Sequence, residues 1–288
     1  MSGIQTDAGS CAWVTGAGGL IGNYIVQIAK EQGIKAVGLT RADLDITDFA
    51  AVERRFRTEQ PPLIIHCAAM SSSPDCQANP ARARAVNVDA TAHLASLACE
   101  SDFLFFSSDL VFDGKKGGYV ETDGVNPLTA YAETKVAAEQ IVLRNGRHKI
   151  VRTSINSGAS PKGNTAYNEL FREAWVHGKT TSLFFDEFRS PIPASVTARA
   201  TWELVTKGPG GIYHLAGAER LSRAQIGKLA AARHPELNPQ IHECSLKEYK
   251  GAPRPADASL NCAKIQKILS FPLPGLTQWL RDHPEVAF

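Results

Sequence analysis

The sequence of 288 residues has little methionine, little net charge and no long apolar run. It contains two Met, and its 31 Lys and Arg nearly balance 29 Asp and Glu, which gives a formal charge of +2. Nucleic-acid binding needs basic residues concentrated on one face, so this balance argues against it. No run reaches the roughly 18 apolar residues of a membrane-spanning helix. The first ten residues, MSGIQTDAGS, lack the basic start and apolar stretch of a secretory signal peptide.

Motifs of several other protein classes are also missing. The eight histidines have no HExxH or HxxxH spacing, so we expect no metal site, and we interpret His66 and His214 as core or strand-end residues. No GxSxG motif occurs, which argues against a serine hydrolase. The cysteines occur singly, without a CxxC pair, and predict reduced thiols in a cytoplasmic protein; they are Cys11, Cys67, Cys76, Cys99, Cys244 and Cys262.

Apolar runs alternate with helical patterns through the first half of the chain, which is typical of βαβ units around a parallel sheet. The expected strands are 10–15, 35–40, 63–67, 103–107 and 148–152, and the expected helices are 20–32, 48–59, 81–100 and 130–145. The second half is less regular, with helices at 170–177, 195–206 and 261–269, an extended segment at 182–185 and a further strand at 211–214. We therefore predict an α/β domain over 1–155, to which 191–215 returns, and a smaller lobe from 156–190 and 216–288.

A glycine-rich turn follows the first expected strand, where residues 15–22 read TGAGGLIG. Glycines at these spacings allow a tight turn, close approach of the backbone to a pyrophosphate and close packing of a helix on a strand. The helix N-terminus adds free N–H groups and the positive end of its dipole. The GK[ST] ending of an NTPase loop is missing, so we predict a dinucleotide rather than ATP. The predicted contacts are Gly16, Gly19, Leu20, Ile21 and Gly22.

The residue after the second strand bears on which dinucleotide is bound. An acid there would bind the ribose 2′-hydroxyl of NAD, and a base would accept the 2′-phosphate of NADP. Arg41 follows the strand directly, and the acids Asp43 and Asp45 come later. We therefore expect NADP(H) to be preferred over NAD(H), with a solvated surface arginine as the alternative interpretation of Arg41.

Tyr131 and Lys135 are four residues apart at the start of an expected helix, so they project from one face. A lysine ammonium near a phenol favours the phenolate, and we expect it to lower the pKa of Tyr131 and make it a usable acid near neutral pH. Ser108 follows the fourth strand, at the edge of a parallel sheet where ligands bind, and could hydrogen-bond the same substrate oxygen. Such a Tyr-x-x-x-Lys pair is common on helix surfaces, and the glycine turn upstream favours the catalytic interpretation.

Because these motifs occur in this order along the chain, the sequence resembles the extended short-chain dehydrogenase/reductases, and within them the dTDP-4-dehydrorhamnose reductase-like group. The resemblance extends over nearly the whole chain. The matching segments are LDITD at 44–48, HCAAM at 66–70, NPARARAVNVDAT at 79–91, SSDLVFDG at 107–114, NPLTAYAETK at 126–135, DEFRSP at 186–191, GIYHLAG at 211–217 and RPADASLNCAKI at 254–265. The resemblance implies a doubly wound Rossmann domain with a small C-terminal substrate-binding lobe, and NAD(P)H-dependent reduction of a keto group on a nucleotide-linked sugar.

The same resemblance implies roles for individual residues. Ser108, Tyr131 and Lys135 match the catalytic trio: Tyr131 would protonate the ketone, Ser108 would position its oxygen, and Lys135 would hold the nicotinamide ribose. The matched cofactor contacts are Asp45 and Ile46 at the adenine and Cys67, Ala68 and Ala69 along the cofactor. Arg254 matches a position that faces the substrate phosphates, and bidentate hydrogen bonding suits arginine to that task. A plain loop arginine is the alternative there.

Some positions depart from the group's pattern. Ser108 replaces Thr, and Leu110 stands where the group has a tyrosine. The group's DQxGxPT appears as residues 186–192, DEFRSPI, which places Arg189 where the pattern has glycine. SSSPDCQANP replaces TxVDxAE after the third strand. These changes bear on which substrate is bound more than on the type of reaction.

Other functions remain open at this stage. A sugar-nucleotide epimerase or dehydratase would use the same Tyr–Lys pair and keep its NAD bound, so that cofactor would copurify. A non-catalytic dinucleotide-binding regulatory protein is the alternative from another class, since the regulatory subunit of methionine adenosyltransferase also resembles this family, and fold does not fix function. By the same resemblance, the helix after Pro127 is a candidate homodimer surface.

Overall fold

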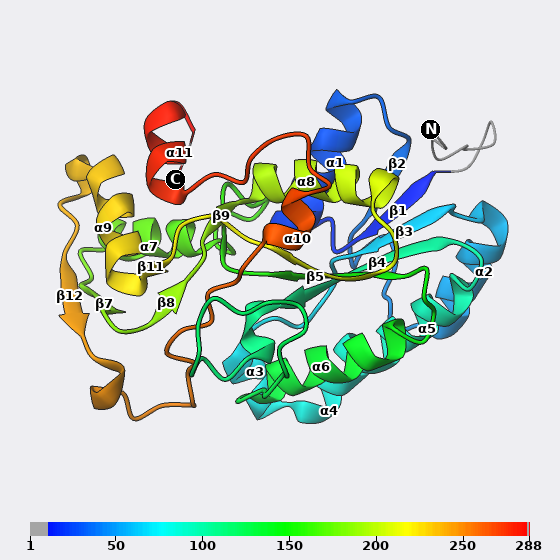
Figure 1. The fold of residues 1–288 in the computed structure, drawn as a ribbon, viewed down its shortest axis with the longest axis horizontal. Coiled ribbons are helices and arrows are strands. Elements are labelled where there is room, and N and C mark those ends of the chain that lie inside the picture. Colours follow the sequence, from blue (N-terminus) through cyan, green and yellow to red (C-terminus); the bar gives the residue numbers. More distant parts are fainter. Residues whose placement is uncertain (1–10, 287) are drawn as a thin grey trace.

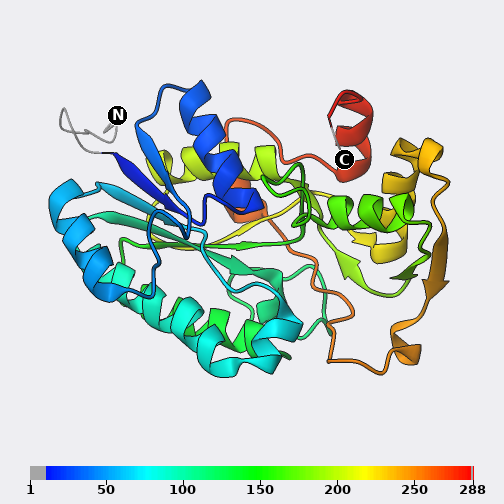
Figure 2. The same cartoon turned by 180° about the vertical axis from the view of Figure 1, so that it is seen from behind.

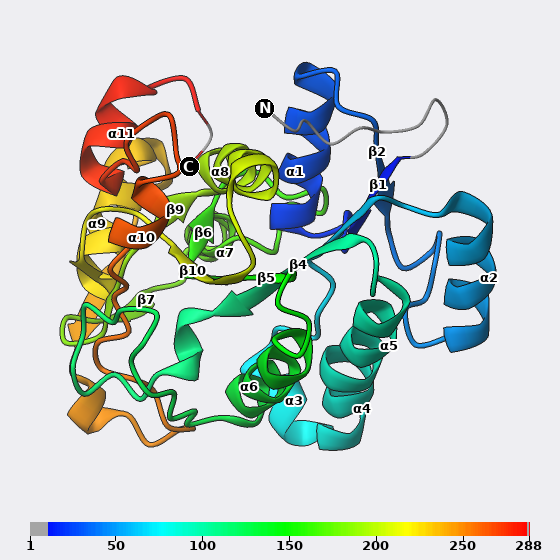
Figure 3. The ribbon, with the colours of Figure 1, turned by 45° about the vertical axis from the view of Figure 1, so that its right-hand side comes forward.

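A six-stranded parallel sheet forms the centre of the fold in the computed structural model, which describes residues 11–286 and 288. The strand order is β10-β5-β4-β3-β1-β2; β10 is labelled in Figure 3 and the other strands in Figure 1. The strands are β1 (Ala12–Thr15), β2 (Ala36–Leu39), β3 (Leu63–His66), β4 (Asp102–Ser108), β5 (Lys149–Thr153) and β10 (Gly211–Leu215). The chain moves from β1 outward in one direction to β2 and in the other through β3 to β10, so the sheet is doubly wound as predicted.

Helices cover both faces of this sheet, as Figure 3 shows. One face carries α1 (Leu20–Glu31) and α8 (Ala194–Lys207), and the other carries α2 (Phe49–Glu59), α5 (Ala90–Leu97) and α6 (Ala130–Val142). Side chains alternate along each strand, so Val14 packs with α1 and α8 while its neighbour Trp13 packs with α2 and α5. Two separate apolar cores therefore fix the sheet, and the carboxyl ends of its strands remain free to position polar groups.

A smaller lobe lies beside the carboxyl ends of the strands (Figures 1 and 2). Its elements are α7 (Tyr167–Val176), β7 (Thr181–Phe184), β8 (Phe188–Arg189), β11 (Leu221–Ser222), α9 (Arg223–Arg233), β12 (Ile241–Cys244) and α11 (Leu276–Asp282). Helices α7, α9 and α11 share a third apolar core. The short pair of β6 (Asn156–Ser157) with β9 (Ile192–Pro193) lies where the chain leaves and re-enters the central sheet, and α10 (Ala263–Gln266) packs against β10.

The prediction of one continuous helix over 81–100 is wrong. The chain forms α3 (Ser73–Ala78), α4 (Pro80–Arg84), a π-helical turn over Ala85–Asp89 and then α5. Asn87 in the π turn accepts from Met70 N at 2.8 Å and donates to Met70 O at 3.0 Å and to Thr134 Oγ1 at 3.0 Å. These contacts tie the helix to the loop after β3 and to α6, and such π turns occur often at functional sites.

Other differences are local. The sequence pattern missed α9 and α11, and it placed the helix around α10 over too long a range. The first strand was expected from Ser10, which lies outside the described residues. Within residues 11–286 and 288, the structure has no helix that combines the length and the apolar character needed to cross a lipid bilayer.

Candidate active site

The glycine turn between β1 and α1 is closed by backbone contacts that leave no room for side chains. Gly16 has a φ of +71°, and a Cβ there would lie 2.6 Å from Ala68 N. A Cβ on Gly22 would collide with the carbonyl oxygen of Gly16. Gly19 is the N-cap of α1 and has no side chain to cap the helix, so the first-turn N–H groups can serve an anion. This cradle fits a pyrophosphate.

The turn opens into a large cavity of about 1500 Å³ along the carboxyl ends of the strands. The cavity reaches from β2 to the lobe, where Lys162, Thr165 and Tyr167 line it. Residues predicted from the sequence that line it are Gly16, Gly19, Leu20, Ile21, Gly22, Arg41, Asp45, Ile46, Cys67, Ala68, Ala69, Ser108, Tyr131 and Lys135. One space therefore connects the glycine turn with the Tyr–Lys pair.

The end of the cavity at β2 carries both a cation and a carboxylate. The Arg41 side chain is 74% exposed, and its Nε lies 3.3 Å from Asp45 Oδ2. Asp45 in turn accepts from Thr47 N at 3.0 Å and from Thr47 Oγ1 at 2.6 Å, and these hydrogen bonds lower the pKa of Asp45. The exposed guanidinium can turn toward an anionic ligand, because a surface ion pair of this kind contributes little stability.

Tyr131 and Lys135 are both buried at the first turns of α6. Thr129 caps this helix by accepting from Ala132 N at 3.3 Å. Lys135 is 2% exposed, and its Nζ lies 4.0 Å from the centre of the Phe105 ring. Burial lowers the pKa of Lys135 to about 7, while the negative charge of Glu139 opposes this shift. A lysine in this state can gain or lose a proton near neutral pH.

The expectation that Lys135 lowers the pKa of Tyr131 is wrong. Burial raises the pKa of Tyr131, the negative charge of Asp109 adds to this effect, and the hydroxyl of Ser108 opposes it. The phenol is 9% exposed and packs in an apolar cluster with Cys76 and Ala83. Desolvation of the phenolate is the largest cause of this shift, so the protonated phenol is the favoured form of Tyr131.

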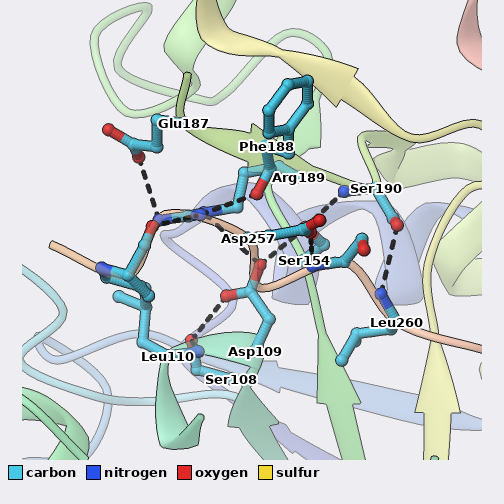
Figure 4. Close-up of polar contacts among 12 residues, drawn as sticks. Ser108, Asp109, Leu110, Ser154, Glu187, Phe188, Arg189, Ser190, Asp257 and Leu260 are labelled. Carbon is cyan, nitrogen blue, oxygen red and sulfur yellow. Dashed lines mark hydrogen bonds and ion pairs between the residues drawn. The ribbon is translucent and has the colours of Figure 1, made fainter. Parts of the chain in front are cut away.

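A buried chain of polar groups connects Ser108 with the lobe (Figure 4). Ser108 Oγ donates to Asp109 Oδ1 at 3.2 Å, and Ser154 Oγ donates to Asp109 Oδ2 at 2.7 Å. Arg189 follows, with Nε 3.7 Å from Asp109 Oδ2 and Nη2 2.9 Å from Glu187 Oε1. Asp109, Glu187 and Arg189 are each at most 3% exposed. Buried charges need such partners, so the network joins β4 and β5 to β8.

Arg254 belongs to this network and does not line the cavity. Its guanidinium binds Glu187 through two hydrogen bonds, from Nε at 2.7 Å and Nη2 at 2.9 Å. It also lies over the rings of Phe184 and Tyr249. The arginine that was expected to face substrate phosphates thus binds a buried carboxylate in the lobe, because Glu187 stands where the group's pattern has a neutral glutamine.

Sequence reasoning missed two residues that line the cavity and two that hydrogen-bond to lining residues. Asn87 and Asp109 lie inside matched motifs, and their polar side chains within apolar segments were the available signal. Lys162 and Thr165 lie in an irregular loop and gave none. His66 is a core residue as interpreted: it bonds Thr15 and Thr91, and burial lowers its pKa to about 3. His214 is likewise buried, with a pKa lowered by burial to about 4.

Comparison with known proteins decides the family. The family model described as the RmlD substrate binding domain matches residues 12–285. The chain belongs to this family. The prediction of a dTDP-4-dehydrorhamnose reductase-like protein with a doubly wound α/β fold is therefore confirmed at the level of family and fold.

Curated relatives include reductases and a subunit of a methionine adenosyltransferase. The chain is 34% identical to the dTDP-4-dehydrorhamnose reductase of Mycobacterium tuberculosis, over 73% of this chain and 71% of that protein. It is 32% identical to the probable low-salt glycan biosynthesis reductase Agl14 of Haloferax volcanii, over 75% and 78%. It is also 29% identical to the methionine adenosyltransferase 2 subunit beta of Xenopus laevis, over 89% and 82%.

A solved structure shares the fold over nearly its full length. The dTDP-4-dehydrorhamnose reductase of Bacillus anthracis, solved in complex with NADP, superposes with a TM-score of 0.87 and is 21% identical. The match covers 95% of this chain and 98% of that one. At this identity the likeness shows the fold, which includes the strand edge where the cavity lies.

Proposed function

We propose that the protein reduces a keto group on a nucleotide-linked sugar, with NADPH preferred over NADH as the hydride source. The observation that supports this most is the single cavity lined by the glycine turn and by Ser108, Tyr131 and Lys135. The residues fit a dinucleotide, since Gly16 and Gly22 form a turn too tight for a Cβ and Gly19 leaves the first N–H groups of α1 without a side-chain cap. The family relationship with sugar-nucleotide reductases agrees with this chemistry.

The cofactor would lie along the strand edge. Gly16, Gly19 and Gly22 with the first N–H groups of α1 would bind the pyrophosphate, and Arg41 would bind the 2′-phosphate of NADP. The remaining proposed contacts are Leu20, Ile21, Asp45, Ile46, Cys67, Ala68 and Ala69. Lys135 would hold the nicotinamide ribose. The bound nicotinamide would supply the hydride.

Proton transfer would come from Tyr131. Because burial keeps its phenol protonated, Tyr131 can give its proton to the ketone oxygen as negative charge develops there. The phenolate that this leaves would favour the charged form of Lys135, whose pKa of about 7 in the ligand-free protein allows it to take up a proton. Ser108 would hydrogen-bond the ketone oxygen and fix its position.

The experiment that tests this function is a screen of NADPH oxidation against a panel of nucleotide-linked 4-keto sugars. We expect one member of the panel to be reduced, with a higher kcat/KM for NADPH than for NADH. A parallel reaction without sugar corrects for slow loss of NADPH. Lack of turnover with every keto sugar, at enzyme concentrations that bind NADPH, would contradict the proposal.

The relationship to methionine adenosyltransferase 2 subunit beta supports a second candidate, a dinucleotide-binding regulatory subunit. This candidate predicts tight NADPH binding without turnover. It also predicts a stable complex with a methionine adenosyltransferase catalytic subunit, which size-exclusion chromatography of the mixture would detect. Turnover of a keto sugar without such a complex would exclude it.

A further inference from the structure

The hydroxyl hydrogen of Ser108 is engaged by the neighbouring side chain of Asp109. A serine hydroxyl has one hydrogen to donate and two lone pairs to accept with. Ser108 Oγ donates to Asp109 Oδ1 at 3.2 Å and accepts from Leu110 N at 3.1 Å. While Asp109 is a carboxylate, it can only accept, so the hydrogen of Ser108 is directed at Asp109. Ser108 then cannot donate to a ketone oxygen at the same time.

The protonation state of Asp109 therefore decides what Ser108 can do. A protonated Asp109 has its own hydrogen to donate, to Ser154 or to Ser108, and no longer requires the hydrogen of Ser108. Burial favours this neutral form and raises the pKa of Asp109, whereas Arg189 and the serine hydroxyls favour the carboxylate. The other ionisable groups that face Asp109 are Glu187 beyond Arg189 and the phenol of Tyr131 on α6.

Arg189 is the cation that pairs with Asp109, and its guanidinium makes three further contacts. Its Nε lies 3.7 Å from Asp109 Oδ2, and its Nη2 lies 2.9 Å from Glu187 Oε1. Its Nη1 donates to Phe188 O at 2.7 Å (Figure 4) and to Pro255 O at 3.1 Å. Both Arg189 and Glu187 stand where the DQxGxPT pattern has uncharged residues, so this chain has a buried cation and its counter-charge together.

We propose that Arg189 and Asp109 are positioning residues that set the direction of the Ser108 hydrogen bond, so that Ser108 donates to Asp109 when Asp109 is ionised and to the substrate ketone when Asp109 is protonated. The lobe thereby acts on the catalytic serine through a pair of charges. The substrate part of this inference rests on the proposed function, whereas the coupling of Arg189, Asp109 and Ser108 does not.

The coupling is tested by NMR titration of protein labelled with ¹³Cγ-aspartate, without substrate. The resonance of Asp109 is the one that disappears in Asp109→Asn. We expect its titration midpoint to move to higher pH in the double variant Glu187→Gln/Arg189→Gly, because the nearer cation Arg189 outweighs the more distant Glu187. We expect Ser108→Ala to move it upward as well, since a donor to the carboxylate is lost. Arg189→Lys keeps the charge and should leave the midpoint near that of the wild type.

The double variant restores the neutral pattern of the group, and circular dichroism confirms that it folds. If it unfolds, Arg189→Gln takes its place, because Arg254 still neutralises Glu187 in that variant, and Ser108→Ala still tests the link between Ser108 and Asp109. An Asp109 midpoint that is unchanged in both Ser108→Ala and the double variant would overturn the proposal, as would a midpoint that Arg189→Lys moves as far as the double variant does.

A kinetic measurement tests the consequence for the reaction. With a reducible sugar, we expect the wild-type kcat to rise as pH falls through the Asp109 midpoint, with little change in KM. This step should be absent in Asp109→Asn and should move to higher pH in the double variant. A step that persists in Asp109→Asn would overturn the role in catalysis. If no sugar is reduced by the wild type, the proposed function fails, and the NMR result still decides the coupling.

Discussion

The two sides of the cavity position their polar groups by different means. On the sheet side, the residues lie at the carboxyl ends of parallel strands, so backbone pairing between β1, β3, β4 and β5 brings the glycine turn, Ser108 and α6 together. On the lobe side, the strands are only two to four residues long, and buried ion pairs hold the segments in place. Substitutions on the sheet side should therefore have their largest effect on the reaction rate, and those in the lobe network should have their largest effect on stability.

Tyr131→Phe tests the sheet side most strongly. We expect a loss of about 10³-fold in kcat for NADPH-dependent reduction, because the proton donor is removed, while NADPH affinity and the free energy of unfolding change little. Steady-state kinetics and fluorescence titration with NADPH measure the two effects. Tyr249→Phe, on an exposed lobe tyrosine, serves as the matched control. Retained turnover in Tyr131→Phe would show that another group is the acid.

Glu187→Ala tests the lobe side. It removes the nearer carboxylate partner of Arg189, which keeps only the pair with Asp109 at 3.7 Å, and it removes both hydrogen bonds that Arg254 donates to Glu187. We expect the free energy of unfolding to fall by about 3–5 kcal/mol, measured by urea denaturation. Glu243→Ala breaks the exposed pair with Lys228 and should cost under about 1 kcal/mol. Similar losses of unfolding free energy in Glu187→Ala and Glu243→Ala would mean that the buried network does not stabilise the lobe.

Gly22→Ala, in the glycine turn, should reduce both the stability of the protein and its binding of NADPH. Its Cβ would meet the carbonyl oxygen of Gly16, and relief of this contact would displace α1 from the cradle. We expect a loss of about 1–3 kcal/mol in stability together with loss of NADPH binding. Gly146→Ala, where a Cβ would meet no atom within 4 Å, is the control and should bind NADPH normally. Normal NADPH affinity in Gly22→Ala would place the dinucleotide elsewhere.

Arg41→Ala should have the smallest effect. Loss of one exposed cation near a 2′-phosphate should weaken NADPH binding about tenfold and leave NADH binding nearly unchanged. Calorimetric titration with each cofactor measures both constants. Arg57→Ala, on an exposed arginine of α2, provides the comparison. Equal losses for the two cofactors would remove the basis for a preference for NADPH.

The same contrast explains how much the sequence could predict. Apolar periodicity and glycine spacing are local, and they predicted the strands of the central sheet and the residues around the turn. The π turn at Asn87 depends on contacts with Met70 and Thr134, which no local pattern contains. The pairing of Glu187 with Arg254 joins residues 67 positions apart. The effect of burial on Tyr131 likewise depends on packing by α3 and α4 that periodicity did not predict.

Transfer of deuterium from 4-deuterated NADPH tests the central claim most directly. The protein is incubated with the labelled cofactor and each nucleotide-linked 4-keto sugar, and mass spectrometry reads deuterium on the former carbonyl carbon. We predict incorporation with one sugar by the wild type and a rate of incorporation about 10³-fold lower by Tyr131→Phe. Failure of the wild type to label any sugar, or equal labelling by the variant, would contradict reduction at this cavity with Tyr131 as the acid.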